Sequence, residues 1–256
     1  MSTLATKDLT IRFGGHVAVN AVTCSFEPGT LTAIVGPNGA GKTTYFNLIS
    51  GQLKASGGSV HLNGRDLSAL APSERARAGL GRAFQLTNLF PNLPVLENVR
   101  LAVQAMQGGT HRRGLNLWSI WSDHRSLTAR AEEILRTVAL WERREAAVAS
   151  LAHGDQRTTE IMMALATRPR LLLLDEPAAG MGTKETFDTA VLIRRLHRKH
   201  KLTIVLVEHD MRVIFNLADR ITVLSEGEVL DRGTPDEIAA SEKVKVAYLG
   251  EKREGS

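Results

Sequence analysis

The sequence predicts an α/β protein with a mostly parallel sheet, an antiparallel β subdomain at its N-terminus and an inserted α-helical subdomain. Short apolar runs alternate with helical periodicities in the second half of the chain, which is the pattern of a parallel sheet. Near the N-terminus apolar residues alternate weakly with polar ones, and a long, mostly helical stretch follows. The 256 residues suffice for one large domain or for a core with an appendage.

The composition excludes several classes of protein. Hydrophobic residues make up 43% of the chain and charged residues 23%, which excludes a disordered or collagen-like chain. A single cysteine, Cys24, excludes a disulfide scaffold and indicates a reducing compartment. The apolar runs are far shorter than the ~20 residues that cross a bilayer. The N-terminus lacks the apolar core of a signal peptide, so we expect the protein to stay in the cytoplasm.

The antiparallel subdomain is predicted from weakly alternating segments. Apolar residues recur within Leu9–Phe13 and Val17–Val22, and Gly14-Gly15 between them is a turn signal. A further short strand, Ser59–Leu62, ends at the strong turn pair Asn63-Gly64. These segments are typical of antiparallel strands.

The parallel core is predicted from apolar strands separated by helices. The buried strand Leu31–Val35 is followed by a helix that begins near Gly41. Farther along, strands are expected at 171–174, 203–207 and 221–224, with helices at 186–200 and 211–218. Near the C-terminus Thr234-Pro235-Asp236-Glu237 combines an N-cap, a helix-starting proline and a capping glutamate, which predicts a last short helix.

Residues 86–166 interrupt this alternation and are predicted to form the helical insertion. Proline breaks at Pro91 and Pro94 open the stretch, and alanine, leucine and charged residues at helical spacing dominate 127–151. The core is therefore assigned to residues 1–85 and 167–256.

A glycine-rich loop between the first buried strand and its helix fits the phosphate-binding pattern. Glycines allow backbone N–H groups to converge on phosphates, and the helix N-terminus adds its positive end. A lysine at the end of the loop reaches the β and γ oxygens, and the next hydroxyl can ligate Mg²⁺. The loop consists of Gly36, Pro37, Asn38, Gly39, Ala40, Gly41, Lys42 and Thr43.

Other candidate functional residues follow strands of the core. Asp175 and Glu176 end an apolar strand, where Asp175 is a candidate metal ligand and Glu176 a candidate base for an attacking water, although such a pair is often only a helix cap. His209 follows the next strand, and a lone histidine there is more often structural; beside Glu176 it would contact the γ-phosphate or the water. Gln85, at the joint with the insertion, is a candidate Mg²⁺ ligand through its amide oxygen.

In this order and spacing, the motifs resemble the ATP-binding subunits of ABC transporters over essentially the whole chain. The resemblance implies a P-loop NTPase core that binds ATP and Mg²⁺. It assigns Gly36–Thr44 to the Walker A loop, so that Thr44 joins the binding residues, and Phe13 to stacking on adenine. It further implies that Asp175 and Glu176 are the Walker B pair with the catalytic base, that Gln85 is the Q-loop glutamine and that His209 is the switch histidine.

The family's signature motif corresponds to Ala152, His153, Gly154 and Asp155, after Leu151. In the family the signature of one subunit closes on the γ-phosphate held by a second. Ala152 offers no hydroxyl, so the contact would depend on Gly154 and backbone N–H groups at the start of the following helix. The carboxylate of Asp155 would repel the triphosphate unless it turns away. The following D-loop, 178–182, also lacks the family's usual aspartate.

Several phrases, among them Val207-Glu208-His209-Asp210-Met211, are similar to subunits of importers for branched-chain amino acids and to their urea and amide relatives. This resemblance implies a homodimer or a heterodimer with a second ABC ATPase, transmembrane permease subunits and, indirectly, a solute-binding protein. It places the chain peripherally on the cytoplasmic face of the inner membrane, with no nucleic acid as partner. The alternatives are a lipid or lipopolysaccharide exporter subunit and an ABC ATPase that acts on nucleic acid or ribosomes.

Overall fold

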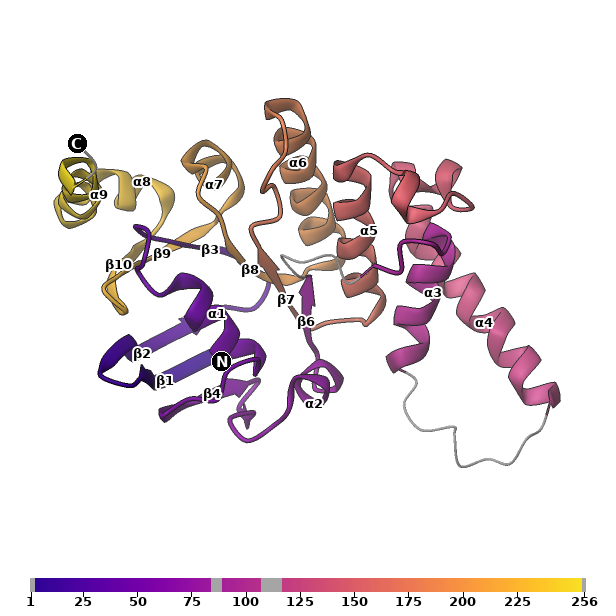
Figure 1. Ribbon diagram of the computed structural model, residues 1–256, viewed down its shortest axis with the longest axis horizontal. Coiled ribbons are helices and arrows are strands. Elements are labelled where there is room, and N and C mark those ends of the chain that lie inside the picture. Colours follow the sequence, from indigo (N-terminus) through magenta and orange to yellow (C-terminus); the bar gives the residue numbers. More distant parts are fainter. Residues whose placement is uncertain (1–2, 84–88, 107–116, 255–256) are drawn as a thin grey trace. The chain divides into compact units, whose positions relative to one another are not determined.

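The computed structural model of the protein describes residues 3–83, 89–106 and 117–254 (Figure 1). The chain divides into two compact units, one formed by Met1–Arg82 with Arg170–Ser256 and the other by Ala83–Pro169. The sequence places the inserted part at 86–166, within the second unit. Among the described residues, no helix is both long enough and apolar enough to span a bilayer.

The first unit is built on a six-stranded sheet in the order β10-β9-β3-β8-β7-β6. The neighbours β9, β3, β8 and β7 are parallel, and β10 runs antiparallel to β9. This confirms the predicted, mostly parallel core. The strands are β3 (Leu31–Val35), β6 (Leu80–Ala83), β7 (Leu171–Asp175), β8 (Thr203–Val207), β9 (Arg220–Ser225) and β10 (Glu228–Gly233).

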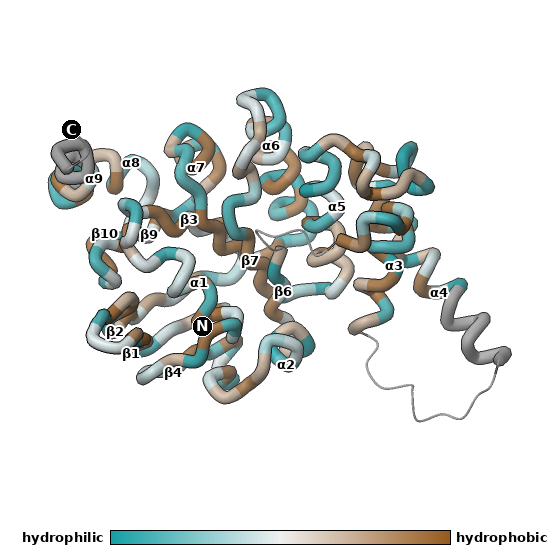
Figure 2. The backbone as a smooth tube through the Cα atoms, viewed as in Figure 1, coloured by the Kyte–Doolittle hydropathy of each residue, from teal (hydrophilic) through white to brown (hydrophobic). Residues whose placement is uncertain are grey.

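The central strands are mostly apolar because helices cover both faces of the sheet. Every residue of β3, β7 and β8 is buried, and Figure 2 shows the hydrophobic colour running along them. In Figure 1, α6 (Thr183–His200) and α7 (Met211–Leu217) lie above this sheet and α1 (Lys42–Ser50) lies below it. Continuous apolar runs, rather than alternating ones, are what such a two-sided sheet requires.

A second, antiparallel sheet has the order β2-β1-β4-β5, which confirms the predicted antiparallel N-terminal part. Its turn between β4 and β5 is formed by Asn63 and Gly64, at φ 49° and 81°, which is the left-handed geometry of a tight hairpin. The strands are β1 (Leu4–Phe13), β2 (His16–Phe26), β4 (Gly57–Leu62) and β5 (Arg65–Asp66).

Helix α1 joins the two sheets of the first unit. Its Tyr45 is fully buried, and the phenol oxygen lies 2.9 Å from the hydroxyl of Thr6 on β1. Phe46, Leu48 and Ile49 belong to the same core cluster as residues of β1, β2 and β7. The burial of these large side chains fixes α1, and with it the loop that precedes the helix.

The second unit is mostly helical, as the sequence predicts. Its Asn98 is fully buried, accepts a hydrogen bond from the Phe90 N–H and donates to the carbonyls of Phe90, Leu93 and Pro94. Asn98 thereby holds the segment before its own helix. The helices are α3 (Val95–Met106), α4 (Leu117–Leu135) and α5 (His153–Ala166), with short 3₁₀ turns η2 (Ala139–Arg143) and η3 (Val148–Ser150).

Several short elements were not predicted from the sequence. Strands β6 and β10 and the helices α2 (Pro72–Arg77) and α9 (Glu242–Glu254) carry too few apolar residues at regular spacing to be recognised. Helix α8 (Pro235–Ala240) begins where predicted, with the Thr234 hydroxyl accepting from the Glu237 N–H, but it is not the last helix, because α9 follows it.

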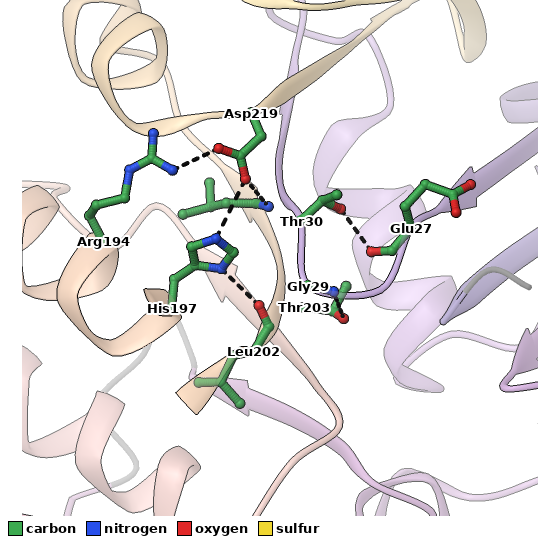
Figure 3. Close-up of polar contacts among 9 residues, drawn as sticks. Glu27, Gly29, Thr30, Arg194, His197, Leu202, Thr203 and Asp219 are labelled. Atoms are coloured by element: carbon green, nitrogen blue, oxygen red, sulfur yellow. Dashed lines mark hydrogen bonds and ion pairs between the residues drawn. The ribbon is translucent and has the colours of Figure 1, made fainter. Parts of the chain in front are cut away.

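At the amino ends of the parallel strands a carboxylate joins helix to sheet (Figure 3). Asp219, before β9, accepts hydrogen bonds from the Leu31 N–H at 2.8 Å and from Arg194 of α6 at 2.7 Å. His197 of α6 lies 3.5 Å from the same carboxylate and contacts the Leu202 carbonyl. Burial raises the pKa of Asp219, but these donors outweigh it and hold the pKa below its usual value.

Replacing Asp219 with alanine should destabilise the first unit, because the Leu31 N–H and Arg194 lose their acceptor. We expect the free energy of unfolding in urea to fall by about 1–3 kcal/mol at pH 7. Since its folded-state pKa is lowered, the contribution of Asp219 is present above about pH 4 and is lost as the pH falls through the lowered pKa. The difference from wild type should therefore shrink in acid.

The matched control is Asp188→Ala, which removes an exposed carboxylate from the same helix α6. It should change the free energy of unfolding by less than about 0.5 kcal/mol. An equal loss in both variants, or a loss from Asp219→Ala that does not depend on pH, would refute the role given to Asp219.

Candidate functional site

The carboxyl ends of three parallel strands lie in register at one edge of the first unit. Val207 of β8 is paired on one side with Ile34 of β3 and on the other with Asp175 of β7. The glycine-rich loop begins at Gly36, directly after β3, and Glu176 follows β7. The register therefore places the loop, the acidic pair and the segment after β8 at the same edge of the sheet.

The loop depends on glycine at positions where a side chain has no room. Gly41 has φ +89°, and a Cβ there would lie 2.4 Å from the Ala18 carbonyl oxygen. A Cβ on Gly36 would lie 2.1 Å from the carbonyl oxygen of Leu224. The loop thus packs backbone against backbone between β2 and β9, while Asn38 and Gly39 at its tip are exposed.

Lys42 opens α1 and folds back over the loop. Its ammonium donates to the carbonyl oxygens of Gly36 at 2.6 Å and Pro37 at 2.7 Å. The side chain is buried, at 6% exposure. These two bonds hold the cation against the loop, where it adds positive charge to the N-terminus of α1.

The remaining predicted binding residues differ in exposure. Thr43 is exposed and Thr44 is half-buried in the first turn of α1, whereas Ala40, earlier in the loop, is buried. Phe13, at the end of β1, is 50% exposed, which is unusual for a ring of this size and suits a surface that covers a flat ligand.

Asp175 is buried at 1% exposure and forms an ion pair with Arg82 of β6, with 3.0 Å between Oδ2 and Nη2. Burial lowers the pKa of Arg82, and the neighbouring carboxylate opposes that shift. The sequence marks Asp175, but its cationic partner comes from the edge strand and was not identified from the pattern.

Glu176 has a left-handed backbone, with φ 48°, and its N–H donates to the Val207 carbonyl at 2.9 Å. This turn aims the side chain at His209, whose Nε2 lies 2.7 Å from Oε1 of Glu176. The structure thus brings together the predicted base and the predicted switch histidine.

Glu208 is a further buried acid at this edge that sequence reasoning assigned no role. Its carboxylate accepts from the Ala178 N–H at 2.9 Å and from the His209 N–H at 3.2 Å. Burial raises the pKa of Glu208, while these two N–H donors lower it and the charge of Glu176 raises it again. Glu208 ties the segment after Glu176 to the segment that carries His209. A charge directly after the apolar run 203–207 is the signal that marks it.

The signature residues start α5 in the second unit. Ala152 is the N-cap and has no side-chain capping bond, while His153, Gly154 and Asp155 form the first turn. The Asp155 carboxylate lies 2.7 Å from Nη1 of Arg143. The predicted repulsion from this carboxylate is therefore offset by a neighbouring guanidinium, which sequence reasoning missed because Arg143 lies in a separate 3₁₀ turn.

Gln85 lies outside the described residues. The D-loop segment is described: the N–H groups of Ala179 and Met181 donate to the carbonyls of Glu176 and Ala178, which makes two consecutive turns. Glu208, directly after the neighbouring strand β8, accepts a hydrogen bond from the Ala178 N–H of this segment.

The donors at this edge fit a nucleotide and a divalent cation. Gly36 and Gly41 allow the loop backbone to pack against β9 and β2, the tip of the loop at Asn38 and Gly39 is exposed, and Lys42 supplies a cation beside it. The hydroxyl of Thr43 and the carboxylate of Asp175 are the hard oxygen ligands that Mg²⁺ prefers.

Comparison with known proteins decides the family. The family model described as "ABC transporter" matches residues 19–179, which is more than half of the chain. The chain belongs to the ABC transporter family. The family inferred from the motifs is thus confirmed.

Three curated relatives align along nearly the whole chain. LivG of Salmonella typhimurium, a high-affinity branched-chain amino acid transport ATP-binding protein, is 40% identical over 249 residues, which cover 97% of this chain and 98% of LivG. BraF of Pseudomonas aeruginosa, which has the same description, is 39% identical with the same coverage. The lipopolysaccharide export protein LptB of Escherichia coli is 32% identical over 251 residues, which cover 98% of each chain.

Solved structures agree with the fold. The ADP conformation of MJ1267, an ATP-binding cassette of an ABC transporter, superposes with a TM-score of 0.83 at 27% identity and covers 98% of this chain and 99% of its own. The dimeric cassette MJ0796 bound to ADP and Pi gives a TM-score of 0.75 at 27% identity, with 91% and 98% covered. The predicted fold class is confirmed, whereas the roles of single site residues stay predictions.

Proposed function

We propose that this member of the ABC transporter family is the ATP-hydrolysing subunit of an importer for branched-chain amino acids or related small polar solutes. The observation that carries the ATPase assignment is the Glu176–His209 pair at the strand end next to the glycine-rich loop. The importer assignment is supported by the two relatives at 39–40% identity that are described as branched-chain amino acid transport proteins.

ATP binding is assigned to the loop and the first turn of α1. The N–H groups of 36–44 and the ammonium of Lys42 hold the phosphates, and the half-exposed ring of Phe13 covers the base. Thr43 and Asp175, with Gln85, would hold Mg²⁺, which neutralises charge on the phosphates and orients them.

Hydrolysis is assigned to Glu176 as the base for the attacking water. His209 lies within hydrogen-bond distance of the carboxylate, and the left-handed backbone of Glu176 directs the side chain toward His209. The carboxylate therefore keeps one orientation at the strand end. His209 is 48% exposed on its side chain, which leaves it accessible to the water or to the terminal phosphate. Holding the water in line is the main chemical task in this reaction, because little covalent chemistry is left to the protein.

The chain acts with partners. A second ABC ATPase, either another copy or a homologue, supplies the signature surface that closes each site, as the dimeric cassette among its structural relatives supports. Membrane permease subunits carry the solute, so the chain is placed peripherally on the cytoplasmic face of the inner membrane. Purification of the chain from its native membrane, with identification of the subunits that co-purify, would identify these partners and distinguish an importer from a lipopolysaccharide exporter. The exporter is the less favoured alternative, because the identity to LptB is lower, at 32%.

Glu176→Gln should lower the ATP hydrolysis rate of the purified complex by about a hundredfold or more, because an amide cannot accept the proton of the attacking water. Binding of ATP should persist, since the loop and Lys42 are unchanged. The measurements are phosphate release and the dissociation constant for ATP. The exposed Glu185→Gln on α6 is the control and should keep the wild-type rate. Wild-type turnover in Glu176→Gln would overturn the assignment of the base.

Arg143→Ala should weaken ATP-driven closure, because it leaves Asp155 as a net negative charge on the signature surface. The pair is exposed, at 58% and 35% of the two side chains, so the fold should survive. At protein concentrations that limit association of the two subunits, we expect the ATPase rate to fall about fivefold. This corresponds to a repulsion of ~1 kcal/mol between Asp155 and the triphosphate. In the double variant Arg143→Ala/Asp155→Gln, the rate should return to near wild type. A double variant as slow as Arg143→Ala would show that the guanidinium does not act through Asp155.

A further inference from the structure

Arg82 makes a buried, two-sided contact at the end of the strand that carries the acidic pair. Its Nη2 lies 3.0 Å from Oδ2 of Asp175, and the two side chains are only 9% and 1% exposed. The interaction therefore takes place away from bulk water, where solvent weakens it little.

The other side of the guanidinium is fixed to the helix of the phosphate loop. Nη1 donates to the hydroxyl of Ser50, the last residue of α1, at 2.6 Å. The guanidinium also lies over the ring of Phe46, 5.5 Å from its centroid. Arg82 thus connects three elements: its own strand β6, the end of β7 and helix α1.

Stability alone does not account for this ion pair. Removing two charges from water costs several kcal/mol, and replacing a buried ion pair with apolar residues is often neutral or stabilising. The neighbouring positions show the apolar alternative, since the first four residues of β7 are all leucine and β3 carries no charged residue. In the proposed function Asp175 is needed as a metal-side carboxylate, and Arg82 is the group that lies within hydrogen-bond distance of this buried carboxylate and orients it.

We propose that Arg82 is a positioning residue that holds the Asp175 carboxylate in one orientation and competes with divalent cations for it in the nucleotide-free protein. The guanidinium fixes Oδ2, while Ser50 fixes the guanidinium relative to α1. The cation is then bound well only when it arrives with the phosphates of the nucleotide. This inference rests on the proposed function, in which Asp175 is the carboxylate on the metal side.

The test is a titration of the nucleotide-free protein with Mn²⁺, followed by electron paramagnetic resonance of the free ion. Arg82→Gln removes the competing charge, so Mn²⁺ should bind about tenfold more tightly than to wild type. A residue with a purely structural role predicts weaker or unchanged binding on removal. Arg77→Gln, an exposed arginine on α2 of the same unit, is the matched control and should bind Mn²⁺ as wild type does. Wild-type Mn²⁺ affinity in folded Arg82→Gln would overturn the proposal.

Arg82→Lys tests the positive charge of Arg82 separately from its simultaneous contacts with Asp175 and Ser50. A lysine keeps the competing charge, so Mn²⁺ affinity should remain within about twofold of wild type, but its single ammonium cannot hold Asp175 and Ser50 together. In the purified complex we expect kcat to fall about fivefold or more while KM for ATP stays unchanged.

If Arg82→Gln does not fold, Arg82→Lys alone decides, and a wild-type kcat would overturn the proposal. If the proposed function is wrong, the wild-type complex does not hydrolyse ATP. If the wild-type complex hydrolyses ATP but the Arg82 variants have the wild-type Mn²⁺ affinity and kcat, only the inference about Arg82 is refuted.

Discussion

The parallel register of β3, β8 and β7 is the constraint on which the rest of the site depends. Because Ile34, Val207 and Asp175 lie side by side, the loop after β3 and the acids after β7 emerge at the same edge of the sheet. Burial of all three strands on both faces fixes this register, since a shift would expose apolar residues and break the ladder. The chemistry of the site is thus positioned by the core, while the loops supply its functional groups.

Buried polar groups then fix the orientation of the side chains and backbone segments at this edge. Lys42 is held by two loop carbonyls, Glu208 holds the backbone of Ala178 and Asp175 is paired with Arg82. Each is a charge in a place where charges are costly to bury, and each has hydrogen-bonding partners that offset the cost. At the opposite ends of the strands, Asp219 has a structural role, because its carboxylate accepts hydrogen bonds from the start of β3 and from α6.

Sequence was sufficient for features governed by local pattern. The apolar runs gave β3 and β8 their bounds, and the Thr234 capping box gave the start of α8. The loop was predicted because its glycine and lysine pattern is specific to phosphate binding, and the roles of Glu176 and His209 were predicted from their positions after strands of the core together with the family resemblance. Arg82, Glu208 and Arg143 were missed, because each acts on a residue distant in sequence or through a backbone N–H, and arginine and glutamate are common in any solvated segment. Likewise the polar edge strands β6 and β10 are defined by their neighbours rather than by their own periodicity.

In the proposed function, the loop 36–44 at this strand edge binds the triphosphate of ATP through its backbone and Lys42. Calorimetric titration of the purified chain with Mg·ATP, beside the variant Lys42→Ala, measures this binding. We expect saturable binding of one nucleotide per chain, weakened about tenfold or more when the ammonium is removed, as for loss of a charge-assisted contact to phosphate. Equal affinity in the two proteins, or no binding by wild type, would contradict it.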